Sequence, residues 1–230
     1  MLNQLMQMTT KNFMKSMENE MPQDSKPERP ALNGDEFTIS KLAAAKRQLD
    51  AAIRMLFSGE DIIAVHTVAA AAGNILKDIS IAKHPDKSWH LQAIQVNKLE
   101  MREYIQIMNA AANFLKHAVR DPDGAWDFSP SETEITLFWA VLEANHFGPK
   151  SELQDFYELW WLASHQSPEW LKGLGEGHEP LVEVSRVLNG RPLQERILTG
   201  LKWRAEHFLA PMGVEQITVT ESKGQERSPI

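Results

Sequence analysis

The sequence contains no cysteine, which excludes disulfide bonds, thiolate nucleophiles and zinc sites built on cysteine ligands. Positive charge is not in excess either, since 24 Lys and Arg residues face 31 Asp and Glu residues and the formal net charge is −7. A wide basic surface for duplex DNA is therefore not expected, although a local basic patch is compatible with these numbers. The absence of cysteine suits a cytoplasmic protein, which is the localisation we predict.

Long apolar runs are also missing. The N-terminal segment has neither the apolar centre nor the small-residue cleavage site of a secretory signal. The apolar stretch at 62–72 contains His66 and is shorter than the ~18 residues that suggest a membrane-spanning helix. We therefore expect no membrane association.

Helical periodicity dominates the remaining pattern, because apolar residues recur at intervals of three and four while alternating patterns are rare. Residues that cap or stop helices punctuate this pattern, among them Gly59, Ser129 with Glu132, and Ser151. The sequence predicts an all-α fold, an irregular bundle of six to eight helices. Expected helices cover 39–58, 61–84, 98–120, 129–147, 151–167, 181–188 and 192–209, and 85–97 has room for another short one.

Composition divides the chain into four segments. Residues 1–36 form a Met-rich arm with prolines among charges, which we expect to be flexible because it cannot bury enough surface to offset chain ordering. A helical core domain is expected at 37–148 and a helical extension packed on it at 149–211. Residues 212–230 should be a flexible tail, and they contain the only strand-like run, 214–220. Trp139 and Trp160 belong to two aromatic-rich helices that should pack together.

A polar stripe marks the expected helix at 98–120. Two of its members, Asn109 and Asn113, are unfavourable in a helix interior, which suggests that they hydrogen-bond to something. A solvated stripe is the alternative. The stripe consists of Arg102, Gln106, Asn109, Asn113, Lys116, His117 and Arg120.

A polar pocket follows if this helix packs antiparallel on the helix at 61–84. The small residues 69–73 permit close approach, so His66 would come within ~10 Å, one interaxial spacing, of His117. A core histidine bonded to a backbone carbonyl is the alternative for His66. The candidate binding residues are His66, Asn74, Asn109, Asn113, Lys116, His117 and Arg120.

Standard enzyme signatures are absent from the sequence. It has no His-Glu-x-x-His, no phosphate-binding Gly-x-x-x-x-Gly-Lys-Ser/Thr loop and no Gly-x-Ser-x-Gly elbow. Glu143 and His146 form a single Glu-x-x-His, whereas di-iron bundles need two. Asp121 and Asp123 are more typical of a turn than of a calcium loop. We therefore predict neither a metal nor a cofactor.

A resemblance to a known family rests on three stretches, QLDAAIRMLFSGEDIIAVHTVAAAAGNILKDI, NAAANFLKHAVRDPD and WDFSP. They resemble a family of uncharacterised bacterial all-helical proteins with an Asn-Phe-x-Lys-His motif leading into Arg-Asp-Pro-Asp. The likeness covers about residues 40–145. The family's helical layout is in turn similar to the HEPN superfamily, small helical bundles that often bind or cleave RNA or act on nucleotides. The resemblance thus implies an HEPN-like core.

The ribonuclease signature of that superfamily, Arg followed by His after four to six residues, is missing at all eight histidines. Asn113 stands at a comparable place before His117, but its amide cannot supply the cationic phosphate contact of arginine. This departure favours binding without catalysis.

Three functions therefore remain open. The first is a binding or interaction module that recognises a nucleotide, an RNA end or a protein partner in the polar groove. The second is a metal-independent RNase-like enzyme in which His117 is the general acid or base. The third is a purely structural helical protein. A homodimer is among the partners that the sequence allows.

Overall fold

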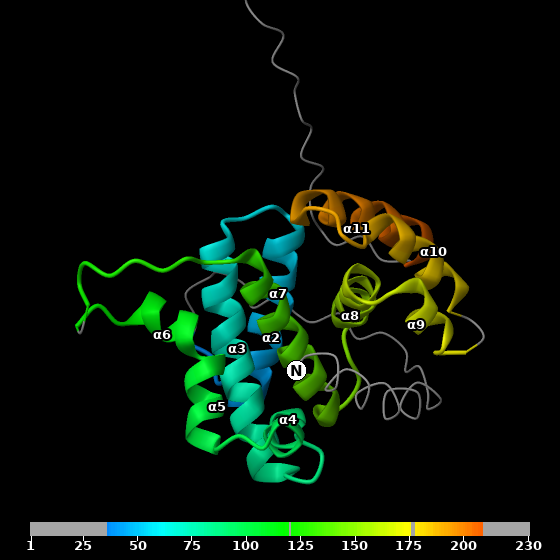
Figure 1. Ribbon diagram of the computed structural model, residues 1–230. Coiled ribbons are helices and arrows are strands. Elements are labelled where there is room, and N and C mark those ends of the chain that lie inside the picture. The colour runs from blue at the N-terminus through cyan, green and yellow to red at the C-terminus, as the bar shows by residue number, and fades with distance from the viewer. Residues whose placement is uncertain (1–35, 120, 176–177, 209–230) are drawn as a thin grey trace, which may run out of the picture.

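The structure is a computed structural model that describes residues 36–119, 121–175 and 178–208. Within these ranges the chain forms ten α-helices and one 3₁₀ turn, and it contains no strand (Figure 1). The predicted all-α class is confirmed. The elements are α2 (Lys41–Phe57), α3 (Ile62–Lys83), α4 (Trp89–Asn97), α5 (Met101–Met108), α6 (Ala110–Lys116), α7 (Pro130–Ala144), η1 (Asn145–Phe147), α8 (Glu152–His165), α9 (Pro168–Lys172), α10 (Glu179–Leu188) and α11 (Leu193–His207).

Side-chain caps set the starts of the long helices. Ser40 accepts the backbone N–H of Ala43 at the start of α2, and Asp61 accepts two backbone N–H groups at the start of α3. The predicted capping box at the start of α7 is present. The Ser129 side chain accepts a backbone N–H of the first turn, and the Glu132 side chain accepts the backbone N–H of Ser129. Each cap satisfies N–H groups that a helix leaves without an intrahelical partner.

The core is built on α3, which packs against both α2 and α7. Small residues line the α3–α7 contact, and a Cβ placed on Gly73 would lie 3.6 Å from the Cβ of Ala140. The expected pairing of the two aromatic-rich helices, α7 and α8, is confirmed by the stacked rings of Phe138 and Trp161, whose centroids lie 3.7 Å apart. One continuous cluster of buried apolar residues extends from α2 to α11.

A buried ion pair joins α11 to α7. Both terminal nitrogens of Arg196 donate to the Glu134 carboxylate, at 2.5 and 2.8 Å. Trp160 of α8 donates its indole N–H to the Arg196 carbonyl at 2.9 Å, and Tyr157 donates to the Glu134 carbonyl at 2.7 Å. These bonds connect three helices at one point, so loss of either side chain would leave the other buried without its hydrogen-bonded ion-pair partner.

The prediction of one continuous helix at 98–120 is wrong. Lys98 has a left-handed conformation (φ 52°) and ends α4, the short helix for which 85–97 had room. Asn109 (φ −104°, ψ 7°) separates α5 from α6, and His117 is already extended (φ −129°, ψ 109°). Asparagine disfavours helix interiors because its side chain competes for backbone hydrogen bonds.

A second correction concerns Pro168, which directly follows the helix expected at 151–167. Ser167 caps a new helix with Pro168 at its first position, so the proline opens α9. These additional short helices raise the number above the six to eight predicted from the sequence.

Several predictions lie outside the described residues: the arm up to residue 35, the tail at 212–230 with its strand-like run, and Arg120. One described helix, α3, is long and apolar enough to cross a membrane by length and composition. The central helix of a folded core meets the same criterion, and α3 packs between α2 and α7.

Replacement of Gly200 by alanine should destabilise the protein. An added Cβ would press against Cδ1 of Trp160 and lie 2.6 Å from its Nε1, in a side chain that is fully buried. Overpacking of this kind costs about 1–3 kcal/mol, and the better helix propensity of alanine offsets up to ~1 kcal/mol of it. We expect urea unfolding to show a net loss of about 1–2 kcal/mol. Leu198→Ala, on an exposed position of the same helix, should change stability little, and an equal effect of both variants would contradict this packing.

Candidate functional site

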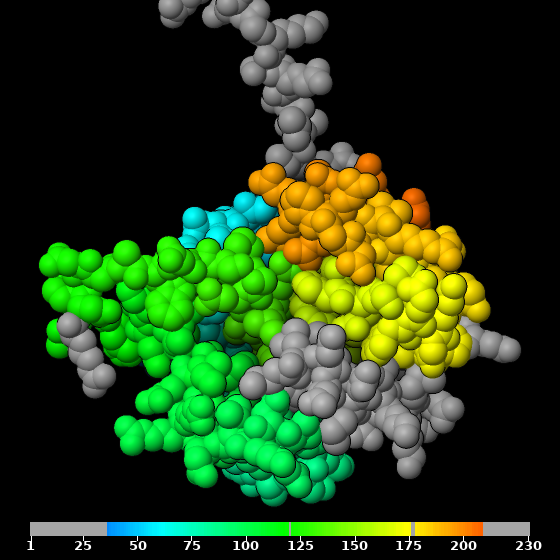
Figure 2. All heavy atoms as spheres, viewed as in Figure 1, coloured from blue at the N-terminus to red at the C-terminus, as the bar shows by residue number. Residues whose placement is uncertain are grey.

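A small cleft opens between α3, α4, α5 and α7, and the about 440 Å³ of space free of protein atoms in and around it includes open solvent. On the face drawn in Figure 2, the surface is hollowed between the green α5–α6 region and the segment that leads into α7, and blue-green atoms of α3 are visible at depth. Six of the residues that line the cleft are polar and six are apolar. Its polar lining is Asn74, Lys77, His90, Tyr104, Asn109 and Thr136, and its apolar lining is Ala70, Gly73, Ile105, Met108, Trp139 and Ala140.

The cleft exists because its base carries almost no side-chain bulk. Gly73 and Ala70 on α3 face Ala140 on α7, and the backbone of α7 approaches Gly73 closely. Larger side chains surround this base, so a hollow remains where the small residues meet. The small-residue run at 69–73 was noted in the sequence for helix approach, and two of its residues, Ala70 and Gly73, also line the cleft.

Lys77 is the cationic residue of the cleft and is only 8% exposed. Its Nζ donates to Oδ1 of Asn74 at 2.9 Å. Its one ion pair among the described residues is with Asp78, at 3.7 Å, and the Asp78 side chain is 74% exposed. An exposed pair of this length stabilises by ~0–1 kcal/mol, so the buried ammonium is only weakly compensated.

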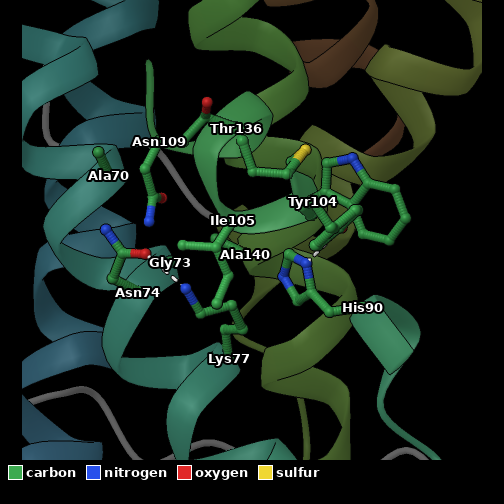
Figure 3. A pocket seen from close by; sticks show the side chains of 12 residues that line it. Ala70, Gly73, Asn74, Lys77, His90, Tyr104, Ile105, Asn109, Thr136 and Ala140 are labelled. Atoms are coloured by element: carbon green, nitrogen blue, oxygen red, sulfur yellow. Dashed lines mark hydrogen bonds between the residues drawn. The ribbon is translucent and has the colours of Figure 1, made fainter. Parts of the chain in front are cut away.

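Two amide side chains accompany Lys77. In Figure 3, Asn109 extends from the α5–α6 junction toward the space in front of Asn74 and Lys77. Because Oδ1 of Asn74 already accepts from Lys77, its amide nitrogen remains a donor. The three side chains thus offer N–H donors from two sides of one small space.

His90 and Tyr104 form the opposite wall. The Tyr104 hydroxyl donates to Nδ1 of His90 at 2.6 Å when the imidazole proton is on Nε2 (Figure 3). The imidazole stacks on Trp139 with ring centroids 5.1 Å apart. Burial lowers the pKa of His90 to about 3, and the nearby charge of Lys77 acts in the same direction. Burial also raises the pKa of Tyr104, so both groups are neutral near pH 7.

Glu143 lies behind this wall. One carboxylate oxygen accepts from the Ser88 hydroxyl and from the His90 backbone N–H, each at 3.1 Å, and it lies 4.0 Å from Nε2 of His90. The other oxygen is 3.6 Å from Nε2 of His146. Burial raises the pKa of Glu143 and lowers that of His146. The Glu-x-x-His pair seen in the sequence is therefore a buried support for the α4 end of the cleft.

Two of the seven predicted binding residues, Asn74 and Asn109, line this cleft. Asn113, Lys116 and His117 are exposed beyond it, and Arg120 lies outside the described residues. The break at Asn109 explains this split, because the second half of the expected stripe no longer continues in the register of the first.

His66 has a different environment. It is buried with its ring edge-to-face against Phe128, and Thr133 Oγ1 lies 3.4 Å from its Nδ1. Burial lowers the pKa of His66, with Lys116 acting in the same direction and Glu132 against it. Within the described residues neither a hydrogen bond nor a ring contact joins His66 to His117. The surroundings fit a core histidine, held by a hydroxyl rather than a backbone carbonyl.

Sequence reasoning missed Lys77, His90 and Tyr104. Lys77 could have been predicted from the sequence, because it follows Asn74 by three residues and shares its helix face. His90 and Tyr104 carried no usable signal, since their positions depend on how α4 and α5 fold back on α3. In the part of the chain that the structure describes, no group of three or more His, Asp or Glu side chains is arranged to hold a metal ion.

Comparisons with models of known families, with curated proteins and with solved structures find no significant match for this chain. The case for the site therefore rests on its own geometry.

The buried His90 should make stability depend on pH. Its pKa is about 3 in the folded protein and ~6.5 in an unfolded chain, so between these values the unfolded state holds the extra proton. The contribution is complete above pH ~6.5 and is lost as the pH falls toward 3. In the His90→Gln variant the amide oxygen can still accept from Tyr104. Between pH 4 and 6, its unfolding free energy should rise with pH less steeply than that of the wild type, by up to ~1.4 kcal/mol per pH unit.

Urea titrations of both proteins at several pH values measure this difference. Other histidines with lowered pKa, such as His165, contribute equally to both proteins and cancel. Equal slopes would show that His90 titrates normally and that the wall of the cleft is not dry.

Proposed function

We propose that the protein is a non-catalytic binding module whose cleft between α3, α5 and α7 holds a small anionic group. The weakly compensated ammonium of Lys77 is the observation that carries this proposal. A buried cation is costly unless an anion or several hydrogen bonds accompany it. Lys77 has one amide acceptor and a distant, exposed carboxylate, so a bound anion would supply what it lacks.

The protonation states in the cleft favour binding over catalysis. A general acid or base works best when its pKa lies near the working pH. His90 is far below that range and Tyr104 above it, so neither exchanges a proton readily at pH 7. They provide fixed polar contacts instead.

Each of the ligands predicted from the sequence carries an anionic group that this cleft could hold. A nucleotide or an RNA end offers a phosphate, and a protein partner offers a carboxylate. The HEPN-like resemblance, which is itself a hypothesis, favours a nucleotide or an RNA end. The alternative RNase-like activity of His117 gains no support from geometry, because that side chain is exposed and lies outside the cleft. The homodimer also stays a prediction.

The test is calorimetric titration of the protein with inorganic phosphate, acetate, N-acetyl-leucine and adenosine monophosphate. We expect at least one anion to bind in a 1:1 ratio, and Lys77→Gln to weaken it at least tenfold because the charge is lost while a side-chain amide remains. Lys116→Gln is the matched control, since it removes a lysine of the predicted stripe that lies outside the cleft. The proposal fails if no anion binds, or if Lys116→Gln has the larger effect.

A further inference from the structure

The charge of the cleft limits which anion it can hold. In the part of the chain that the structure describes, Lys77 is the single cationic side chain that lines the cleft. A phosphate monoester carries about −1.5 to −2 at pH 7, whereas a carboxylate carries −1. One ammonium therefore neutralises a carboxylate but leaves a phosphate with excess negative charge in a largely buried space.

Neighbouring groups add to this limit. The Glu143 side chain lies behind the wall of the cleft, with Oε1 4.0 Å from Nε2 of His90, so this neighbour supplies no positive charge to the cleft. Among the described residues no arginine lines the cleft, so none of them supplies the forked donor set that often recognises phosphate. Asn74 and Asn109 offer neutral donors, which suit the two oxygens of a planar carboxylate.

The apolar lining residues indicate what the carboxylate is attached to. Ile105 and Met108 on α5 border the cleft next to the Lys77 side, and Ile105 is 37% exposed. Trp139, 8% exposed, contributes a mostly buried aromatic ring to the lining. An apolar group bound beside the carboxylate would cover surface that is now open to water.

From this charge balance and lining we infer that the ligand is a monocarboxylate with a short apolar substituent, held by Lys77, Asn74 and Asn109 and covered by Ile105 and Met108. This inference rests on the proposed anion-binding function and names its ligand class. The same chemistry has two sources, a free small carboxylic acid or the C-terminal carboxylate of a peptide.

The experiment compares matched probes by calorimetry with the full chain. N-acetyl-leucine should bind at least tenfold more tightly than N-acetyl-leucinamide, which lacks the charge, and than acetate, which lacks the apolar group. Butyl phosphate should bind more weakly than pentanoate, which has a similar chain length. A tetrapeptide ending in Ala-Leu distinguishes the sources: tighter binding than N-acetyl-leucine indicates a peptide terminus, and weaker binding indicates a free acid.

Two variants keep the test independent of folding defects. Asn109→Ala and Met108→Ala alter partly exposed positions, so both should keep the wild-type melting temperature within a few degrees. Asn109→Ala should weaken N-acetyl-leucine and acetate alike, whereas Met108→Ala should weaken N-acetyl-leucine and leave acetate unchanged. Lys77-dependent binding of phosphates without binding of carboxylates would overturn this inference and leave the proposed function standing. Absence of Lys77-dependent binding of any probe would overturn both.

Discussion

The close contact between α3 and α7 is the constraint on which the rest of the structure depends. Gly73 and Ala140 let the two backbones approach, and the absence of bulk at this contact leaves the hollow that becomes the cleft. The same contact fixes the position of Lys77 relative to α7, because Lys77 lies one turn after Gly73 on α3. A larger residue at either position would separate the helices or fill the hollow, so core packing and the site share one cause.

A second set of contacts holds the frame around that hollow. Phe138 stacks on Trp161, while Glu134 and Arg196 fix α11 against α7. These interactions lie on the side of α7 that faces α8. Because contacts with α8 and α11 hold α7 on that side, its other side can line the cleft with small residues and the Trp139 ring while α7 keeps its position.

Much of the fold could be predicted from the sequence, because caps and periodicity are local. The starts of α3, α7 and α8 follow from Asp61, Ser129 and Ser151. The site could be predicted only in part. Asn109 was recognised as costly inside a helix, but the same property breaks the helix, and this displaced Asn113 and His117 from the pocket that had been expected around them. His90 and Tyr104 meet across a turn whose geometry depends on Lys98 and on packing against α3, which no local pattern encodes.

The most direct test of the account is to locate the bound anion by nuclear magnetic resonance, using ¹³C-methyl methionine and ¹⁵N-histidine labels. Addition of N-acetyl-leucine near pH 7 should shift the Met108 methyl signal and the ring ¹⁵N signals of His90, because both residues line the cleft that holds the ligand. The His117 signals should not move. Shifts at His117 with none at Met108 or His90 would place the ligand on the exposed segment after α6 and contradict the account.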